Sequence, residues 1–227
     1  LVFGRDGRLF ITLGDRNSER ARAQTLDSHI GKVVRIERDG KVPADNPFAS
    51  RSGARPEIWS YGHRNVQGIA IDPATGNVWT NEHGPQGGDE LNLDRPGRNY
   101  GWPVIGFGVN YTTGKAIHDG THREGMEQPL HIWVPSIGIS GAMFYTADRF
   151  PGWKGNLFIG GMAGEQVGRV TIAGDKVLAR ETLLPGVGRV RDIRQGPDGF
   201  IYLVTEDDDG KPTPVVRLEP VERTTSR

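Results

Sequence analysis

Four repeats of one local pattern constrain the fold of this chain more than any other feature. In each repeat, an apolar pair precedes a turn containing glycine or proline and then about four mostly apolar residues; the repeats begin at Val2, Ile69, Met143 and Asp192. Asp-Gly or Gly-Asn dipeptides occupy the turns, and they favour tight hairpins because glycine adopts a positive φ without strain. We therefore predict four β-hairpins.

Additional strand-like segments lie at residues 32–36, 168–172, 176–179 and 214–218. Repeats of about 40 residues or more that each supply about four strands are typical of propeller blades. We therefore predict an all-β fold, a β-propeller with about four blades over residues 1–219, followed by a polar tail at residues 220–227. Long insertions between the strands are the expected place for a functional site.

Composition excludes several classes of protein. Glycine and proline, 33 and 15 of 227 residues, argue against long helices. Lys+Arg and Asp+Glu balance at 28 each, so no broad electric field would attract nucleic acid or an anionic membrane. The chain has no cysteine and no apolar run near the roughly 18 residues that span a bilayer. We expect no nucleic-acid partner, no disulfide and no membrane span.

The chain begins with Leu1-Val2-Phe3, which has the character of a strand interior. Each propeller blade buries its faces against its neighbours, so an open set of four blades would leave two faces in water. We therefore expect the N-terminus to be a processing boundary and the functional molecule to be longer than this chain.

The segment at residues 57–68 contains a candidate ligand-binding set. The guanidinium of Arg64 is a planar fork of donors that suits a carboxylate. Asn65 and Gln67 lie two positions apart, which places their amides on one face of an extended chain. Spacing alone favours a simpler alternative, in which Arg64 makes a structural hydrogen bond to a carbonyl in a surface turn.

The segment at residues 81–92 has the composition of a metal-binding loop. Glycines, a proline and three acids cluster after a predicted strand, and carboxylate and carbonyl oxygens are the ligands that calcium prefers. An acidic loop without an ion is an equal alternative. The acidic run at residues 206–210 lacks further ligands at a useful spacing, so we interpret it as a solvated hairpin tip.

Two further segments complete the candidate set. Tyr100 and Tyr111, beside glycine and proline, could floor a pocket for a flat ring or a sugar, although packing between blades is the commoner role of such aromatics. Arg189 and Arg191 share a face of a predicted strand. With Arg64 they could surround a polyanionic ligand, and local acids are their alternative partners. We assign no role to the histidines at positions 118, 122 and 131.

Taken together, these segments resemble the soluble glucose/sorbosone dehydrogenase family, in its pyrroloquinoline-quinone (PQQ)-dependent aldose sugar dehydrogenase branch. The matching runs lie at residues 31–35, 44–48, 61–68, 82–85, 88–90, 99–103 and 196–199. Each motif alone is weak, but their common order over nearly the whole chain makes the combination specific. The resemblance implies a propeller that has six blades in the full-length parent and binds PQQ and calcium.

The resemblance also implies a reaction. In this family the anomeric hydroxyl of an aldose is oxidised to a lactone: a histidine removes the hydroxyl proton, hydride passes to the quinone, and calcium polarises the quinone. An aldose is therefore the expected substrate and an external electron acceptor the expected partner. A periplasmic or secreted location and a monomeric or dimeric state are also expected.

By position, the resemblance assigns cofactor contacts to Arg64, Asn65, Gln67, Tyr111, Gly161, Met162, Ala163, Arg189 and Arg191. It assigns the main-chain carbonyls of Gly84 and Pro85 to the calcium beside the cofactor. It assigns Glu90 and the carbonyl of Tyr100 to a second calcium. Arg64 receives a catalytic role as well, because its charge would stabilise the reduced cofactor.

Two departures from the family pattern bear on activity. The general-base histidine is expected just before Leu1, and neither His63 nor His83 matches its position, so we predict that the isolated chain is an inactive fragment. Some family members carry a lysine near Ala163, and losing one cation is expected to weaken cofactor binding by about 1–3 kcal/mol. A non-catalytic calcium-binding propeller for carbohydrate or protein is the main alternative. A metal-dependent lactonase is a weaker one, since no ligand set for it can be placed.

Overall fold

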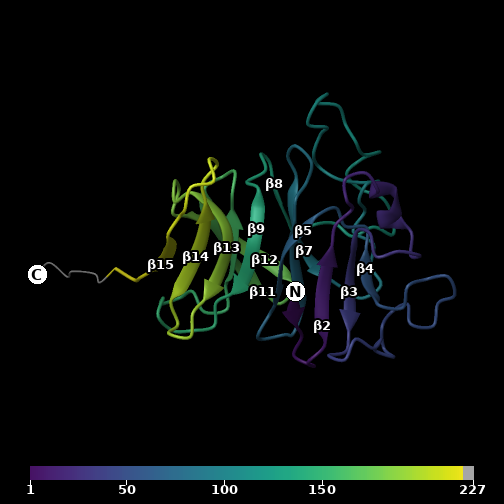
Figure 1. Cartoon of the computed structure of the whole chain (residues 1–227), viewed down its shortest axis with the longest axis horizontal. Helices are drawn as coiled ribbons and strands as arrows, with labels where there is room; N and C mark the ends of the chain where they lie inside the picture. Colours follow the sequence, from purple (N-terminus) through teal and green to yellow (C-terminus); the bar gives the residue numbers. More distant parts are fainter. Residues whose placement is uncertain (222–227) are drawn as a thin grey trace, which may run out of the picture.

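The computed structural model describes residues 1–221, which form β-strands arranged in four antiparallel sheets (Figure 1). Blade 1 contains β1 (Val2–Phe3), β2 (Leu9–Leu13), β3 (Lys32–Ile36) and β4 (Ile58–Tyr61); blade 2 contains β5 (Val66–Ile71), β6 (Val78–Glu82), β7 (Asp89–Asp94) and β8 (His131–Trp133); blade 3 contains β9 (Ile139–Phe144), β10 (Leu157–Gly161), β11 (Gln166–Ala173) and β12 (Lys176–Leu183); blade 4 contains β13 (Arg189–Gln195), β14 (Ile201–Glu206) and β15 (Val215–Leu218). Within this part of the chain, the one helical element is the five-residue 3-10 turn η1 (Arg20–Gln24). It has neither the length nor the apolar character of a membrane-spanning helix.

The four predicted hairpins are present as β1–β2, β5–β6, β9–β10 and β13–β14, each an antiparallel pair. The all-β prediction and the prediction of about four blades are therefore confirmed. The predicted polar tail is described only at residues 220–221, which have no regular structure and are exposed, and residues 222–227 lie outside the described part.

Strand β7 lies in the segment that we predicted to be a metal-binding loop, and that part of the prediction was wrong. Only residues 83–88 form a loop between β6 and β7. In β7, Leu91 and Leu93 alternate with polar residues, as in a strand, but Asn92 and Asp94 are buried as well. Glu90 and Asp94 therefore lie on the strand face opposite Leu91 and Leu93, and Asp89 lies on the face of the leucines.

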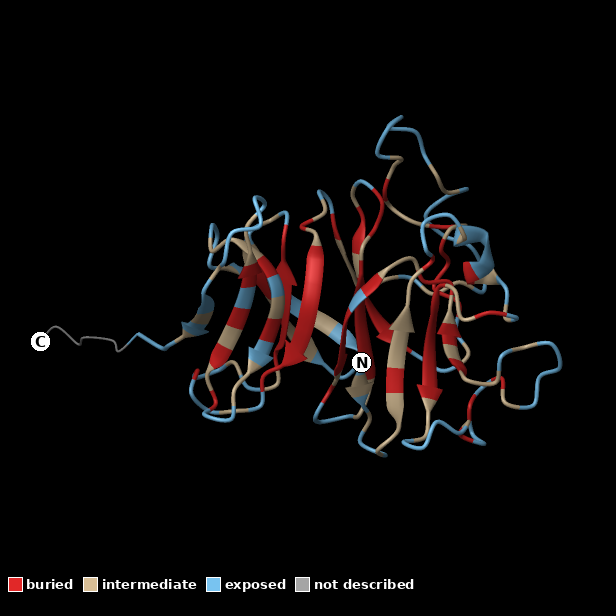
Figure 2. Ribbon diagram, in the orientation of Figure 1, coloured by how far each residue is buried: buried red, intermediate tan, exposed pale blue. Residues whose placement is uncertain are grey.

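The first strands of the blades lie side by side around the centre of the molecule. Strand β9 packs against both β5 and β13, and β1 packs against β5 (Figure 1). Buried residues concentrate on the strands, while exposed residues lie mainly in the turns and in the long loops (Figure 2). This arrangement is that of consecutive propeller blades.

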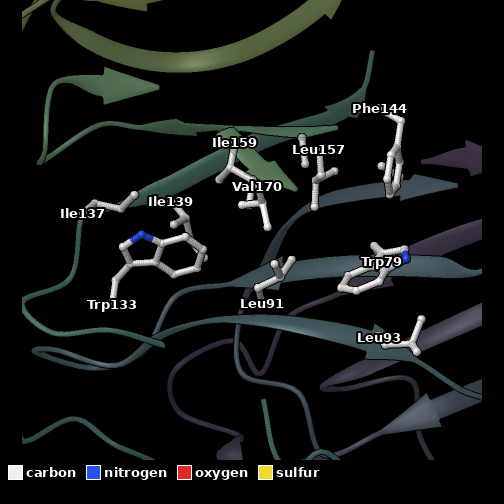
Figure 3. Packing of buried hydrophobic residues seen from close by; sticks show 12 residues of the cluster. Trp79, Leu91, Leu93, Trp133, Ile137, Ile139, Phe144, Leu157, Ile159 and Val170 are labelled. Carbon is white, nitrogen blue, oxygen red and sulfur yellow. The ribbon is translucent and has the colours of Figure 1, made fainter. Parts of the chain in front are cut away.

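Apolar clusters join neighbouring blades. Between blades 2 and 3, Trp79, Leu91 and Leu93 lie opposite Leu157, Ile159 and Val170 (Figure 3). Between blades 3 and 4, a second cluster includes Phe158, Ile193 and Leu203. Burial of this surface is the main favourable contribution to packing of one blade on the next.

The order of the strands determines where the predicted site residues lie. Because neighbouring strands are antiparallel, one edge of the sheets is reached by the ends of β4, β6, β8, β10 and β12. Strands β5, β7, β9, β11 and β13 begin at the same edge. The segments at residues 62–65, 83–88, 134–138, 162–165 and 184–188 therefore all lie at this edge. It is referred to below as the site edge.

Candidate functional site

Two adjoining cavities open at the site edge. The larger, of about 360 Å³, is lined by His83, Pro85, Gln86, Gly87, Asp89, Tyr111, Pro135, Ser136, Gly138, Met162, Ala163 and Arg189. The smaller, of about 20 Å³, is lined by Arg64, Glu82, His83, Gly84, Pro85, Glu90, Trp102, Gly106, Phe107 and His118. His83 and Pro85 line both. Blades 2, 3 and 4 thus contribute residues to one concave region.

Arg64 lies in the linker between β4 and β5, and its side chain turns toward the loop at residues 83–88. Its Nη1 donates hydrogen bonds to the carbonyl oxygens of His83 (3.0 Å) and Gly84 (2.8 Å). Its Cζ lies 5.3 Å from the Trp102 ring centroid and 6.0 Å from that of Tyr111, within the range of cation–π attraction. The simpler alternative, a guanidinium bound to carbonyls, therefore describes this structure, although the carbonyls belong to the candidate site.

Asn65 and Gln67 lie beside each other, as their spacing predicts. Gln67 Nε2 donates to Asn65 Oδ1 at 2.8 Å. A β-bulge between Val66 and Gly68 turns Gln67 out of the sheet, and its side chain is exposed. Neither side chain lines the two cavities, so a contact with a cofactor remains a prediction.

The loop at residues 83–88 folds tightly on itself, and Asp89 holds it. A Cβ at Gly84 would lie 2.3 Å from the carbonyl oxygen of Gly88, so only glycine fits there. Asp89 Oδ1 accepts from the Gly84 N–H, and Oδ2 accepts from the Ile139 N–H of blade 3, both at 3.1 Å. Burial opposes ionisation, but hydrogen bonds from His83 and from the Ile139 N–H lower the pKa of Asp89.

The smaller cavity has the volume of about one water molecule or ion, and its wall is mostly apolar, with the carboxylates of Glu82 and Glu90 as its acidic groups. Asn92 Nδ2 donates to Glu82 Oε1 (3.2 Å) and to Glu90 Oε2 (3.3 Å), which brings the two carboxyl groups together. Burial, followed by repulsion from Glu82, raises the pKa of Glu90 to about 8. A divalent cation in this cavity would relieve that repulsion, so the donor set fits calcium.

The side chain of Tyr100 has a structural role in this fold. Its hydroxyl donates to the Leu93 carbonyl (2.5 Å) and accepts from the Arg95 N–H (2.8 Å), and its ring is buried. Only its carbonyl could serve as a metal ligand. In residues 1–221, no three His, Cys, Asp or Glu side chains form a set that could hold a metal ion, and the predicted ligand sets differ because they include carbonyl oxygens.

The predicted arginine pair of blade 4 is only partly directed at the larger cavity. Arg189 lines the cavity, but its Nε also pairs with Glu206 (3.0 Å) and Asp208 (2.9 Å). Arg191 pairs with the other oxygen of Glu206 and does not line the cavity. The alternative in which local acids pair with both arginines therefore describes this structure.

Of the three predicted positions in blade 3, Met162 and Ala163 line the larger cavity. Gly161, at the end of β10, is buried and does not. Ala163 is exposed, so the wall of the cavity is open at the position where some family members carry a lysine.

Sequence reasoning missed the buried environment of His63. Its side chain is fully buried between blades 1 and 2, and Nδ1 lies 3.0 Å from Glu82 Oε1. Burial opposes protonation, but Glu82 and then Asp94 raise the pKa of His63. The pair is separated by 19 positions and follows no recognised spacing. The sequence offered only the presence of His63 and Glu82 in two matching motifs.

His118, to which we assigned no role, also lines the smaller cavity. Its Nδ1 lies 3.0 Å from the Pro103 carbonyl oxygen, which makes Nδ1 the donor and leaves Nε2 as a buried atom without a partner. Burial lowers its pKa, and Arg64 contributes to the same direction. No spacing in the sequence pointed to this position.

Comparison with known proteins identifies the class. The family model described as Glucose / Sorbosone dehydrogenase matches residues 1–217. This chain belongs to that family.

Two individual relatives match nearly the whole of this chain. The aldose sugar dehydrogenase YliI of Escherichia coli is 46% identical over 213 residues, covering 93% of this chain and 57% of the relative. The uncharacterized protein slr1608 of Synechocystis is 44% identical, covering 94% of this chain and 53% of the relative. The chain thus spans about half the length of these relatives.

Solved structures share the fold. The soluble aldose sugar dehydrogenase of E. coli in its apo-form has a TM-score of 0.85 at 46% identity, covering 91% of this chain and 60% of that one. The PQQ-bound aldose sugar dehydrogenase of Streptomyces coelicolor has a TM-score of 0.75 at 30% identity, covering 96% and 60%. The propeller prediction agrees with both.

Proposed function

We propose that this chain forms part of a PQQ- and calcium-dependent dehydrogenase that oxidises aldoses at the anomeric carbon to lactones. The observation that carries the proposal is the larger cavity, in which Tyr111, Met162, Ala163 and Arg189 from three blades meet beside Arg64. A PQQ-bound relative has the same fold at 30% identity. A periplasmic or secreted location and an external electron acceptor are part of the same proposal.

The residues of this chain would bind and orient rather than take the substrate proton. Arg64 would face the quinone with its guanidinium, and Arg189 would offer a charge to a carboxylate of the cofactor. Tyr111, which is exposed beside Arg64, would cover one side of the ring. When bound, PQQ would accept hydride from the anomeric carbon while a base takes the hydroxyl proton. His63 is too deeply buried to be that base.

Two calcium ions would bind near the smaller cavity. One would be held by the carboxylate of Glu90 and the carbonyl of Tyr100, and the one beside the cofactor by the carbonyls of Gly84 and Pro85. In this structure the Gly84 oxygen accepts from Arg64 Nη1, so ion binding would require that hydrogen bond to shift. The ion would hold the cofactor and polarise its carbonyl.

The test is a dye-linked oxidation assay with the full-length gene product, added calcium and PQQ. Saturable quinone binding together with aldose oxidation is expected. Arg64→Ala should lower kcat/KM about 10- to 100-fold, the effect of one charge-assisted hydrogen bond. A full-length protein that neither binds PQQ nor oxidises aldoses would refute the proposal.

The alternative is a calcium-binding propeller that has lost its redox role, and Ala163 is the observation that favours it. If the quinone site is retained, Ala163→Lys should tighten PQQ binding about tenfold or more, because a cation would then face the cofactor's carboxylates. Calorimetric titration of both proteins decides between the two functions. A non-catalytic propeller should show no saturable quinone site in either protein.

A further inference from the structure

His63 is buried in a polar environment that the proposed function does not require. Its side chain has no solvent exposure, and its ring stacks on Tyr100 with centroids 4.7 Å apart and planes at 20°. It follows Gly62, which has a φ of +78° and lies where an added Cβ would be only 2.2 Å from Asn99 Oδ1, so only glycine fits there. The local backbone is thus shaped to put the imidazole between blades 1 and 2.

Both ring nitrogens of His63 have partners. Nδ1 lies 3.0 Å from Glu82 Oε1, and Nε2 lies 2.9 Å from Ser60 Oγ. Asp94 Oδ2 is 3.9 Å from Nε2. An imidazole held in this way cannot exchange a proton with a substrate, but it fixes the carboxylate of Glu82.

Glu82 also binds Arg64, the residue that follows His63. Its second oxygen, Oε2, accepts a 2.7 Å hydrogen bond from the Arg64 N–H. Its Oε1 accepts from Asn92 Nδ2 as well as facing His63. The carboxylate therefore determines where the main chain of Arg64 lies.

The side chain of Arg64 in turn binds the two residues that follow Glu82. Its guanidinium binds the carbonyls of His83 and Gly84, which directly follow Glu82, and the His83 N–H donates to the Asn65 carbonyl at 3.1 Å. The segments at residues 63–65 and 82–84 are thus joined by side-chain and main-chain hydrogen bonds in both directions. These hydrogen bonds are called the His63–Glu82 brace below.

We propose that His63 is a positioning residue: through the His63–Glu82 brace it sets the location of the Arg64 guanidinium at the quinone site. The proposal rests on the proposed function, because it assumes that Arg64 faces PQQ. A buried polar pair of this kind gives less stability than a well-packed apolar pair of the same size. Its presence beside the site is explained if it selects one geometry for Arg64.

The test is a fluorescence or calorimetric titration of the full-length gene product with PQQ in the presence of calcium, which reports affinity and stoichiometry separately. His63→Gln, whose amide reaches toward Ser60 rather than Glu82, should raise the Kd about 10- to 100-fold, as expected for a lost charge-assisted hydrogen bond. His63→Asn, whose amide can replace Nδ1, should raise it by less. If His63→Gln does not fold, Glu82→Gln tests the same contact.

Two controls separate positioning from general destabilisation. His29→Gln removes a more exposed histidine–glutamate pair, with Glu57 at 3.2 Å, and should leave the Kd unchanged. Tyr145→Phe removes a buried hydrogen bond to the Gly199 carbonyl, far from the site edge, and should lower stability without changing the Kd. A purely structural role of His63 would lower the stoichiometry and leave the Kd unchanged, which would overturn the proposal.

A double variant shows whether the effect passes through Arg64. In an Arg64→Ala background, His63→Gln should change the Kd by less than about twofold, since residues that act as a unit are not additive. An effect as large as in the wild type would overturn the proposal. A wild-type protein without any PQQ affinity would instead refute the proposed function, so the two failures are distinguishable.

Discussion

At the scale of single residues, we expect the Glu90 side chain to lower the free energy of unfolding without calcium and to be needed for stabilisation by calcium. Its carboxyl group is close to Glu82, and burial raises its pKa to about 8, so without an ion its charge is unfavourable at neutral pH. We expect Glu90→Gln to raise the free energy of unfolding by about 1–3 kcal/mol in EDTA. With calcium at 100 times its Kd, the wild type should gain about 2.7 kcal/mol and the variant much less.

Thermal unfolding of both proteins in EDTA and in calcium measures this reversal. Glu127→Gln, at a more exposed carboxylate paired with Arg98, is the matched control and should respond to calcium as the wild type does. Equal calcium stabilisation of wild type and Glu90→Gln would contradict the metal assignment.

Lys32 provides a pH dependence that needs no ligand. Its Nζ donates to the carbonyls of Arg22 (2.9 Å), Ala23 (3.0 Å) and Ile30 (2.6 Å), yet burial lowers its pKa to about 8 from an ordinary value of 10.5. The folded protein therefore holds this proton less tightly than the unfolded chain, and the free energy of unfolding should rise as the pH increases from about 8 to about 10.5.

Urea unfolding at pH 7 and pH 10 tests the sign. Relative to Lys32→Met, the wild type should gain about 2 kcal/mol over this interval. Lys41→Met, at an exposed lysine, is the control. It also removes a charge, but its difference in free energy of unfolding from the wild type should not change between pH 7 and pH 10. A difference between wild type and Lys32→Met that does not change with pH would show that Lys32 keeps its ordinary pKa.

The candidate residues could be predicted from the sequence where short motifs contain them, and not where folding alone creates the contact. Arg64 and the carbonyls of Gly84 and Pro85 lie in two matching runs, and the structure brings them together. The contact of His63 with Glu82 depends on how blade 1 packs on blade 2, which no local pattern encodes. The position of His118 depends in the same way on a long loop.

At the scale of secondary structure, hairpins were predictable and acidic strands were not. The four hairpins carry both an apolar pattern and a turn dipeptide, so two independent signals agree. Strand β7 has the sequence DELNLD, in which four of the six residues are polar, and it follows a glycine-rich loop. Its polar face is buried against another blade, and burial of that kind cannot be distinguished from exposure in a sequence.

Asp89, at the start of β7, ties the loop at residues 83–88 to blade 3. Asparagine has one oxygen where aspartate has two, so Asp89→Asn leaves either the Gly84 or the Ile139 N–H without an acceptor. We expect the free energy of unfolding to fall by about 2–4 kcal/mol, measured by urea denaturation. Asp175→Asn, at an exposed carboxylate that joins the same two blades through Arg95, should cost less than about 1 kcal/mol. Equal costs would show that Asp89 is no more than a surface contact.

At the scale of the whole molecule, the interfaces between blades differ in character. The interface of blades 2 and 3 has an apolar interior around Trp79 and Leu157 (Figure 3), and polar contacts lie outside it, from Asp89 to the Ile139 N–H and from Arg95 to Asp175. The interface of blades 1 and 2 is apolar only around Phe10 and Val78, and toward the site edge it becomes polar around His63. The position of Arg64 therefore depends on the interface of blades 1 and 2, whereas the interior of the blade 2–3 interface contributes apolar packing.

Leu157→Ala tests this separation. Leu157 is fully buried at the start of β10, at the end of blade 3 away from the site edge, and its truncation should lower the free energy of unfolding by about 2–5 kcal/mol. The Kd for PQQ in the full-length gene product should stay within about twofold of the wild type, because no contact of Arg64 changes. Arg64 is positioned through the polar interface of blades 1 and 2, so His63→Gln should give a smaller loss of stability for a larger loss of affinity. Urea unfolding and PQQ titration of both variants test this expectation. If blade packing as a whole set the geometry of the site, Leu157→Ala would lose more PQQ affinity than His63→Gln.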